Sequence, residues 1–205
     1  MSEKRDLEGM VKFVFELGQL KRLPRSGWLK LGIEDPESVA EHSFRTGVIG
    51  YLLAVMEGYD PHKVAGYCLL HDIAETRTGD LDWLAQRYLD RGDYLSSEVL
   101  EDQLENLPEE VEKTMKQTFD EFKGEEVLKR IARDADLLEL AFQALEYEAS
   151  GNQQSGNWFE NTVTLLKTDS GKRLGNLLRK HYNSDSLENL LGWWREGGFK
   201  EGRGN

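Results

Sequence analysis

Residues 38–75, SVAEHSFRTGVIGYLLAVMEGYDPHKVAGYCLLHDIAE, contain the signals that decide the fold. Ser38 followed three residues later by Glu41 is a capping box, in which each side chain accepts a hydrogen bond from the backbone N–H of the other residue. Such a pair marks the start of a helix. We therefore predict a helix over residues 39–57, which ends before Gly58 because glycine readily takes the left-handed conformation of a helix end.

A second helix start follows at Asp60 and Pro61. The aspartate side chain can accept hydrogen bonds from the free N–H groups of the first turn, and proline fits the first helical position because it has no N–H to lose. Apolar residues continue at helical spacing through Ile73. We expect this helix to end near Thr78 and Gly79.

The rest of the chain has the same helical character. Apolar residues recur at three-and-four spacing, which is typical of amphipathic helices, and only 4 Pro interrupt them. We find no convincing strand, internal repeat or linker of Gly, Ser or Pro. The sequence therefore predicts an all-α fold, with a single domain over residues 1–197 and a flexible tail over 198–205. Further helices are expected over residues 7–20, 81–89, 94–106, 108–122, 125–149, 158–168, 171–181 and 186–196.

Composition excludes several classes of protein. The 205 residues are 39 % hydrophobic with 20 Gly, as in ordinary globular proteins. The net charge of −12 repels phosphate backbones and anionic lipids, so we expect neither a duplex nucleic acid partner nor a membrane. No apolar stretch approaches the ~18 residues that span a bilayer, and no secretory signal is visible. Because a lone Cys68 fits a reducing compartment, we expect a cytoplasmic protein.

Two of the four histidines are candidates for a functional site. His71 is followed by Asp72 and Glu75, and on a helix these positions lie within half a turn of one another. His42 belongs to the first turn of the preceding helix. Imidazoles with carboxylates suit Mn, Fe, Co, Ni or Zn, whereas sites made of oxygen alone suit Mg or Ca. Spacing alone leaves two interpretations open, a metal site and an exposed ion pair of His71 with Asp72.

Several short motifs occur in order along the chain: Arg22-Leu23-Pro24, Glu41-His42-Ser43, His71-Asp72-Ile73-Ala74-Glu75, Thr78-Gly79-Asp80 and Ala135-Asp136. Together they resemble the signature of HD-domain metal phosphohydrolases, and most closely that of the YfbR-type 5′-deoxynucleotidases with their archaeal and eukaryotic relatives. The resemblance extends from Leu17 to Gly151. It implies a helical HD domain, a homodimer, one divalent metal ion (Mn, Co, Fe, Ni, Zn or Mg) and a small nucleotide substrate. The implied reaction hydrolyses deoxyribonucleoside 5′-monophosphates to deoxynucleoside and phosphate.

The resemblance also assigns roles to individual residues. The four implied metal ligands are His42, His71, Asp72 and Asp136. Glu75 matches the catalytic carboxylate, which relays a proton and does not bind the metal. Arg22 matches the arginine that orients the phosphate; the alternative is that it only caps the first helix. The loop that holds the nucleoside corresponds to Asp80, Leu81, Asp82 and Trp83. Trp83 could stack on a base, or it could belong to the core.

The helix expected over residues 125–149 carries two aspartates, Asp134 and Asp136, two residues apart. Its apolar stripe places Asp134 nearer the buried face; the stripe is formed by Leu128, Ile131, Ala135 and Phe142. The resemblance instead assigns the metal to Asp136. We follow the resemblance and expect Asp134 to be solvated, or to support the metal ligands from behind.

Other activities have to be weighed against a 5′-deoxynucleotidase. Hydrolases of the alarmone ppGpp carry a Glu-Asp pair after the HD motif, whereas this chain has Glu75 followed by Thr76. A cyclic-nucleotide phosphodiesterase is a second rival, and a non-catalytic helical scaffold that binds metal is a third. Glu75 and Arg22 favour an enzyme, because a purely structural metal site needs neither a free carboxylate nor an arginine for phosphate.

Overall fold

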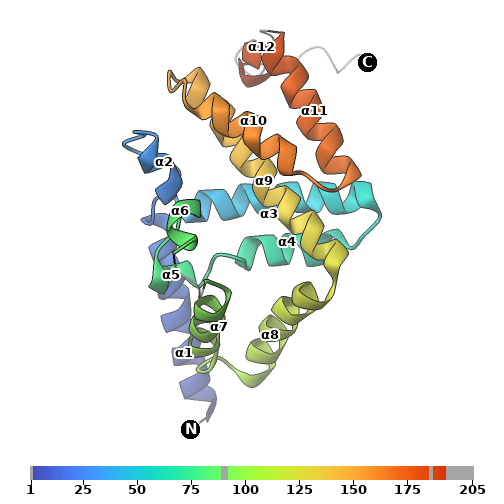
Figure 1. Cartoon of the computed structure of the whole chain (residues 1–205). Helices are drawn as coiled ribbons and strands as arrows, with labels where there is room; N and C mark the ends of the chain where they lie inside the picture. The colour runs from blue at the N-terminus through green and yellow to red at the C-terminus, as the bar shows by residue number, and fades with distance from the viewer. Residues whose placement is uncertain (1, 89–91, 185–186, 193–205) are drawn as a thin grey trace, which may run out of the picture.

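The computed structural model describes residues 2–88, 92–184 and 187–192, and within these ranges the chain is helical (Figure 1). No strand occurs in the described part; Pro24 and Ser38 form an isolated β-bridge. The predicted all-α fold is confirmed, whereas the predicted tail at 198–205 lies outside the described residues. The helices are α1 Ser2–Leu17, η1 Gly18–Lys21 (a 3₁₀ helix), α2 Ser26–Lys30, α3 Val39–Glu57, α4 Pro61–Leu70, α5 Glu75–Thr78, α6 Trp83–Gln86, α7 Gly92–Leu104, α8 Glu109–Gly124, α9 Glu126–Ala149, α10 Ser155–Leu165, α11 Asp169–Asn183 and α12 Leu187–Gly192.

Helix α3 begins and ends where its capping signals predict. The Ser38 hydroxyl accepts from the backbone N–H of Glu41 at 3.2 Å, and the Glu41 carboxylate accepts from the backbone N–H of Ser38 at 2.7 Å. Gly58 ends the helix with a φ of 78°, in the left-handed region that favours glycine. These caps satisfy N–H and carbonyl groups that a helix end leaves without partners. They fix the first turn of α3, which contains His42.

The helix predicted to run from Pro61 to about Thr78 is wrong in its second half. It is capped by Asp60 as expected, but α4 ends at Leu70. The backbone N–H of Ile73 then donates to the carbonyl of Leu70, a 3₁₀-type bond, and the separate helix α5 begins at Glu75. The His71 ring donates to the carbonyl of Cys68, which satisfies this carbonyl without a further helical turn.

The other boundaries agree with the predictions less closely. The short helix α2 occupies a segment whose Pro and Gly residues predict a loop, and α6 covers only part of the helix expected over 81–89. Helices α7 and α10 are displaced by two or three residues from their predicted ranges, and α11 extends two residues beyond its predicted range at each end. Such displacements are expected because helix ends fray and local capping decides them.

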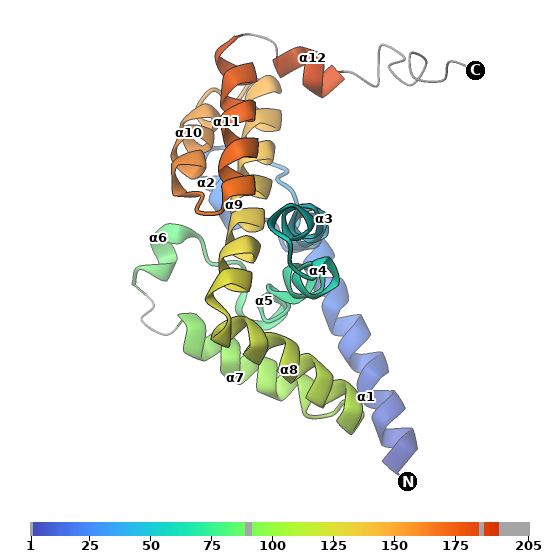
Figure 2. The ribbon, with the colours of Figure 1, turned by 90° about the vertical axis from the view of Figure 1, so that its right-hand side faces the viewer.

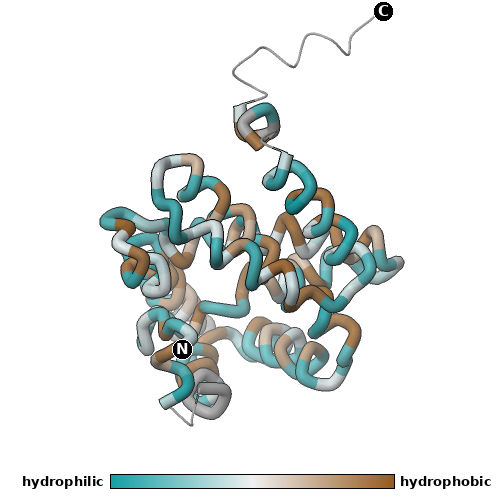
Figure 3. The backbone as a smooth tube through the Cα atoms, turned by 45° about the horizontal axis from the view of Figure 1, so that its top comes forward, coloured by the Kyte–Doolittle hydropathy of each residue, from teal (hydrophilic) through white to brown (hydrophobic). Residues whose placement is uncertain are grey.

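The core lies where α3, α4, α9 and α10 pack on one another. Figure 2 shows α3 and α4 side by side, with α9 passing next to them and α10 and α11 packed along α9. Brown and teal stretches alternate along the helices in Figure 3, as expected of helices with one buried face. The fully buried side chains include Leu53, Val64, Ile131, Leu138 and Phe159. Burying each aliphatic side chain of this kind contributes about 1.5–3 kcal/mol.

Gly50 allows α3 and α4 to approach closely. A Cβ atom at this position would lie 2.8 Å from the Cys68 sulfur and 3.2 Å from a methyl group of Val64. Both residues are buried on α4. The close approach brings the beginning of α3 and the end of α4 together, and with them His42 and His71.

The described helices are too short or too polar to span a membrane. None of them combines the length and the apolar character that crossing a bilayer requires.

Candidate active site

His42 and Asp136 come from the two long helices of the core. The His42 ring, on α3, is fully buried. Its Nε2 lies 3.3 Å from Asp136 Oδ1 on α9 and 3.8 Å from Asp72 Oδ2. Its Nδ1 lies 2.6 Å from Glu139 Oε2, also on α9. The ring therefore has one nitrogen bonded to the buried Glu139, with the Glu37 carboxylate also nearby, and the other nitrogen toward the predicted metal ligands.

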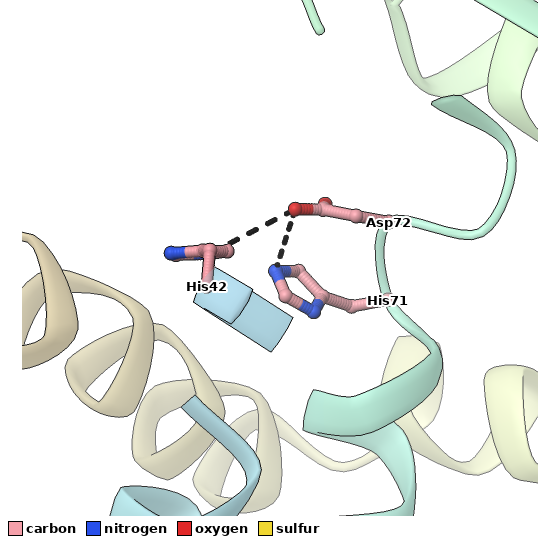
Figure 4. Close-up of side chains that lie close together, drawn as sticks. All are labelled: His42, His71 and Asp72. Atoms are coloured by element: carbon pink, nitrogen blue, oxygen red, sulfur yellow. Dashed lines mark ion pairs between the residues drawn. The ribbon is translucent and has the colours of Figure 1, made fainter. Parts of the chain in front are cut away.

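His71 and Asp72 lie in the turn between α4 and α5. His71 Nδ1 is 2.6 Å from the carbonyl oxygen of Cys68, which can only accept, so this nitrogen carries the hydrogen. Its Nε2 is 3.2 Å from Asp72 Oδ2. One ligand atom from each of His42, His71 and Asp72 lies within 4.8 Å of the others. Figure 4 shows the Asp72 carboxylate reaching both imidazoles.

The charges of the metal cluster, which we define as His42, His71, Asp72 and Asp136, fit a divalent cation. Burial lowers the pKa of His42, but hydrogen bonds with Asp136 and Glu139 outweigh it and raise this pKa to about 10. Burial raises the pKa of Asp72, but the charge of His71 outweighs it and lowers this pKa to about 2. The His42 ring likewise holds the pKa of Asp136 well below its usual range, against the effect of burial. The carboxylates thus stay ionised and attract positive charge, and the imidazole nitrogens and carboxylate oxygens suit a transition metal.

Asp134 has a different task from Asp136. It is fully buried, and its carboxylate accepts from the backbone N–H groups of Lys167 and Thr168 and from the Thr168 hydroxyl. Thr168 is the N-cap of α11, so Asp134 holds the start of that helix. The expectation of a solvated carboxylate is wrong. The apolar periodicity predicted the burial of Asp134 correctly. A carboxylate can lie on a buried face when hydrogen-bond donors surround it, as they do here.

A cavity of about 350 Å³ opens beside the cluster. Its walls come from the segment before and within α2, the turns around α5 and α6, and the facing sides of α9 and α10. This volume lies within the range of small-molecule sites. Of the residues predicted to be catalytic or to contact substrate, the cavity is lined by Glu75, Asp80, Leu81, Asp82 and Trp83.

Glu75 is the first residue of α5 and lines the cavity without being used elsewhere in the described structure. Its Oε2 atom is buried, and no described residue gives it a hydrogen-bond partner. Burial and the negative charges of Asp72 and Asp80 raise the pKa of Glu75 to about 9. The side chain therefore carries a proton at neutral pH in the metal-free protein. An acid of this kind beside a cavity is a candidate for proton transfer.

The loop residues of the cavity differ in how firmly other residues hold them. Asp80 accepts from Arg25 Nη1 at 2.9 Å and from the backbone N–H of Ser26 at 2.5 Å. Asp82 caps α6 and forms an ion pair with Lys30. Trp83 is 65 % exposed, so the alternative of a core residue is wrong.

The structure does not bring Arg22 to the cavity. This residue is exposed, and its backbone N–H ends η1 by donating to the carbonyl of Gln19 at 2.8 Å. Arg25 lines the cavity instead. The reason is local, because the backbone bonds that flank the bridge of Pro24 with Ser38 hold Arg25 against the start of α3. Sequence reasoning singled out the first arginine of this segment, and only the turn after η1 reveals that the second one faces the site.

Sequence reasoning also missed Glu139 and Arg45. Glu139 is fully buried, between the His42 ring and the Arg45 guanidinium. A signal was present, since Glu139 follows Ala135 by four residues and so lies on the apolar stripe of α9. A charged residue at such a position needs a partner of opposite charge or a hydrogen-bond donor.

Comparison with known proteins matches the HD domain family over residues 17–177. This chain is a member of the HD domain family. The HD-domain protein is also 32 % identical over 188 residues to the 5′-deoxynucleotidase HDDC2 of Xenopus laevis. This match covers 89 % of this chain and 92 % of that relative. The 5′-deoxynucleotidase hdd1 of Schizosaccharomyces pombe is 27 % identical over 191 residues, with 90 % and 92 % of the two chains covered.

A solved structure has a similar fold. A conserved hypothetical protein from Pyrococcus furiosus superposes on the HD-domain protein with a TM-score of 0.68 and is 29 % identical, over 84 % of this chain and 99 % of that one. The family that the motifs resemble is therefore confirmed. The prediction of an enzyme of the hydrolase class is confirmed with it.

Proposed function

We propose that this HD-domain protein is a divalent-metal-dependent 5′-deoxynucleotidase, which hydrolyses deoxyribonucleoside 5′-monophosphates to deoxynucleoside and phosphate. The observation that carries the proposal is the buried Oε2 of Glu75, to which no described residue gives a hydrogen bond, in the same cavity as His71, Asp72 and Asp136. A structural metal site needs no free acid. The names of the relatives support the substrate class.

The proposed metal ligands are His42, His71, Asp72 and Asp136, which present two imidazoles and two ionised carboxylates. When bound, a divalent ion of this kind supplies a Lewis acid that polarises the phosphoryl group and acidifies a water molecule. The imidazoles favour Mn, Co, Fe, Ni or Zn over Mg.

Glu75 moves a proton at its Oε2 atom in the proposed reaction. The oxygen of water forms the new bond to phosphorus, and the bond between phosphorus and the 5′ oxygen of the nucleoside breaks. The leaving oxygen needs a proton, which the protonated form of Glu75 can donate, and the resulting Glu75 carboxylate then takes up the proton that the attacking water loses. In the metal-free protein, burial and the negative charges of Asp72 and Asp80 favour that protonated form.

Arg25 is the proposed phosphate-binding side chain, in place of Arg22. Its planar guanidinium presents several N–H donors, which suits phosphate oxygens. Its contacts with Asp80 at 2.9 Å and Asp72 at 3.4 Å hold the group at the edge of the metal cluster. A local positive charge of this kind is needed, because the protein as a whole has a net charge of −12 and repels nucleotides.

The nucleoside is proposed to bind along the loop of residues 80–83. Trp83 offers an exposed ring face for stacking on a base, and Leu81 lines the same cavity. Asp80 and Asp82 are held by Arg25, Lys30 and backbone N–H groups, so we assign them to the shape of this loop.

A homodimer is proposed on the strength of the outer face of α3. Phe44 is 68 % exposed and Leu52 56 % exposed, and their apolar neighbours on this face are Val48, Tyr51, Val55 and Met56. A helix that is apolar on all sides is normally buried. We expect light scattering to give a dimer mass and Leu52→Glu to give a monomer. A monomer of 23.5 kDa for the unaltered protein would contradict the dimer.

We further propose a cytoplasmic location, which cell fractionation tests.

The substrate experiment is a panel of dAMP, AMP, cyclic AMP and ppGpp, each tested with Mn²⁺, Co²⁺, Zn²⁺ and Mg²⁺. Release of phosphate from dAMP, at a rate well above that from AMP, is the expected result. Hydrolysis of cyclic AMP or ppGpp alone would assign the protein to another class of HD phosphohydrolase. Metal binding with no hydrolysis of any substrate would favour the scaffold.

A further inference from the structure

Glu139 connects a proposed metal ligand to an arginine inside the core. Its Oε2 atom is 2.6 Å from His42 Nδ1, and its Oε1 atom accepts from Arg45 Nε at 2.8 Å. Both Glu139 and His42 are fully buried. A carboxylate in such a place stays ionised only if its charge is compensated, and Arg45 together with the His42 ring provides this.

Arg45 is in turn held by two further residues of α9. Its Nη1 atom donates to both carboxylate oxygens of Glu146, at 2.9 and 2.8 Å, and its Nη2 atom donates to Gln143 Oε1 at 2.6 Å. The three residues of α9 follow one another at intervals of four and three, while His42 and Arg45 are three apart on α3. The contacts thus join one face of α9 to one face of α3.

The two proposed imidazole ligands differ in what holds their Nδ1 atoms. The Nδ1 of His71 donates to a neutral carbonyl group, that of Cys68, at the end of its own helix. The Nδ1 of His42 faces an anionic carboxylate from another helix. A carboxylate behind a ligand histidine fixes the ring and its tautomer, and it makes the opposite nitrogen a stronger donor to a metal.

We propose that Glu139, oriented by Arg45, is a positioning residue that accepts the Nδ1 hydrogen of His42 and so keeps Nε2 directed at the metal cluster. Asp72 and Asp136, which face this Nε2, then lie on the opposite side of the ring from Glu139. The inference rests on the metal site of the proposed function, but it is independent of the substrate.

The test is Glu139→Gln, which keeps the size of the side chain and removes its charge. The probe is Co²⁺, and its dissociation constant is measured by calorimetry without any substrate. Loss of a carboxylate that supports a metal ligand weakens metal binding about 10- to 100-fold, and we expect a change in this range. The matched control is Glu160→Gln, which breaks an ion pair with Arg179 on other helices and leaves Co²⁺ binding unaltered. Equal Co²⁺ affinity in folded Glu139→Gln and in the unaltered protein would overturn the inference.

A second measurement needs no variant and remains decisive if Glu139→Gln fails to fold. In the Zn²⁺-loaded protein with ¹⁵N-labelled histidine, nuclear magnetic resonance should show His42 with a protonated Nδ1 and a metal-bound Nε2. The opposite assignment overturns the inference, and so does a chain that binds neither ion. Metal binding without phosphate release from dAMP would overturn only the proposed function.

Discussion

The two sides of the metal cluster are built in different ways. His42 and Asp136 belong to α3 and α9, which are long helices packed in the core. His71, Asp72 and Glu75 belong to a turn and to the first residue of a helix of four residues, α5. The first side is held by the packing of long helices, whereas the second is held by the hydrogen bonds of a turn, the contact of Arg25 with Asp72 and the burial of Ile73.

The same contrast appears in exposure. His42 and its partner Glu139 are fully buried, whereas Trp83, across the cavity, is 65 % exposed. Sites on helices are held more precisely than sites on loops, and loops admit ligands. We infer that both sides contribute proposed metal ligands and that only the loop side also contacts substrate. Substitution of a proposed ligand on either side should therefore abolish metal binding, whereas substitution of the other residues of the loop side should change kinetics while the metal stays bound.

The largest effect is expected for Asp136→Ala. Loss of this carboxylate removes a proposed ligand from the core side, so metal and turnover should disappear together. Thermal stability of the metal-free protein should also fall, because the buried His42 ring loses the ionised carboxylate that lies 3.3 Å from its Nε2. Elemental analysis and a thermal melt measure both quantities. Full metal occupancy in this variant would contradict the assignment.

Asp134→Ala is the matched control, two residues away on the same helix. It leaves the N–H groups of Lys167 and Thr168 without their acceptor, which should cost roughly 3 kcal/mol of unfolding free energy. For a chain of this size that lowers the melting temperature by about 10 °C. The folded fraction should keep its metal. Loss of metal without loss of stability would reverse the roles of the two aspartates.

The next effect concerns Glu75, on the loop side. Glu75→Gln cannot donate or accept a proton at this position, so kcat should fall by about 10²–10⁴. The metal should stay bound, because Glu75 is not a proposed ligand. Parallel measurement of kcat and of metal content decides the matter, and a variant that has lost its metal would make Glu75 a ligand.

The residues of the two sides also differ in how far the sequence alone predicts them. Helical periodicity was sufficient to predict α3, its caps and the burial of Asp134, since each depends on residues within one or two turns. It could not predict that α4 ends at Leu70, because the break involves a side-chain bond from His71 to Cys68. The resemblance named Asp136, which the structure places beside His42, but its role stays a prediction. The apolar stripe of α9 indicates that Glu139 is buried, but its contact with His42 spans 97 positions of the chain, so no local pattern identifies this partner.

A smaller effect is expected from the arginines of the loop side. Arg25→Ala should remove a charge-assisted hydrogen bond to phosphate, worth roughly 1.5–3 kcal/mol, and so lower kcat/KM by about 10- to 100-fold. Arg22→Ala removes the same charge from an exposed position and should change kcat/KM by less than about twofold. Steady-state kinetics on dAMP compares them. A larger fall of kcat/KM in Arg22→Ala than in Arg25→Ala would assign phosphate binding to Arg22, as the family resemblance implies.

The smallest effect should come from Trp83, whose ring lies largely in solvent at the mouth of the cavity. Stacking of a base on an aromatic ring contributes about 1–3 kcal/mol, and a ring left open to solvent should give a value near the lower limit. We therefore expect Trp83→Ala to raise KM for dAMP about fivefold, with kcat unchanged, because the ring touches the base and not the phosphate. Trp83→Phe should restore most of the affinity. The melting temperature should stay constant, since little of the ring is buried. A fall in kcat at constant KM would show instead that Trp83 orders the loop around Asp80 and Glu75, and the loop side would then be as closely tied to the chemistry as the core side.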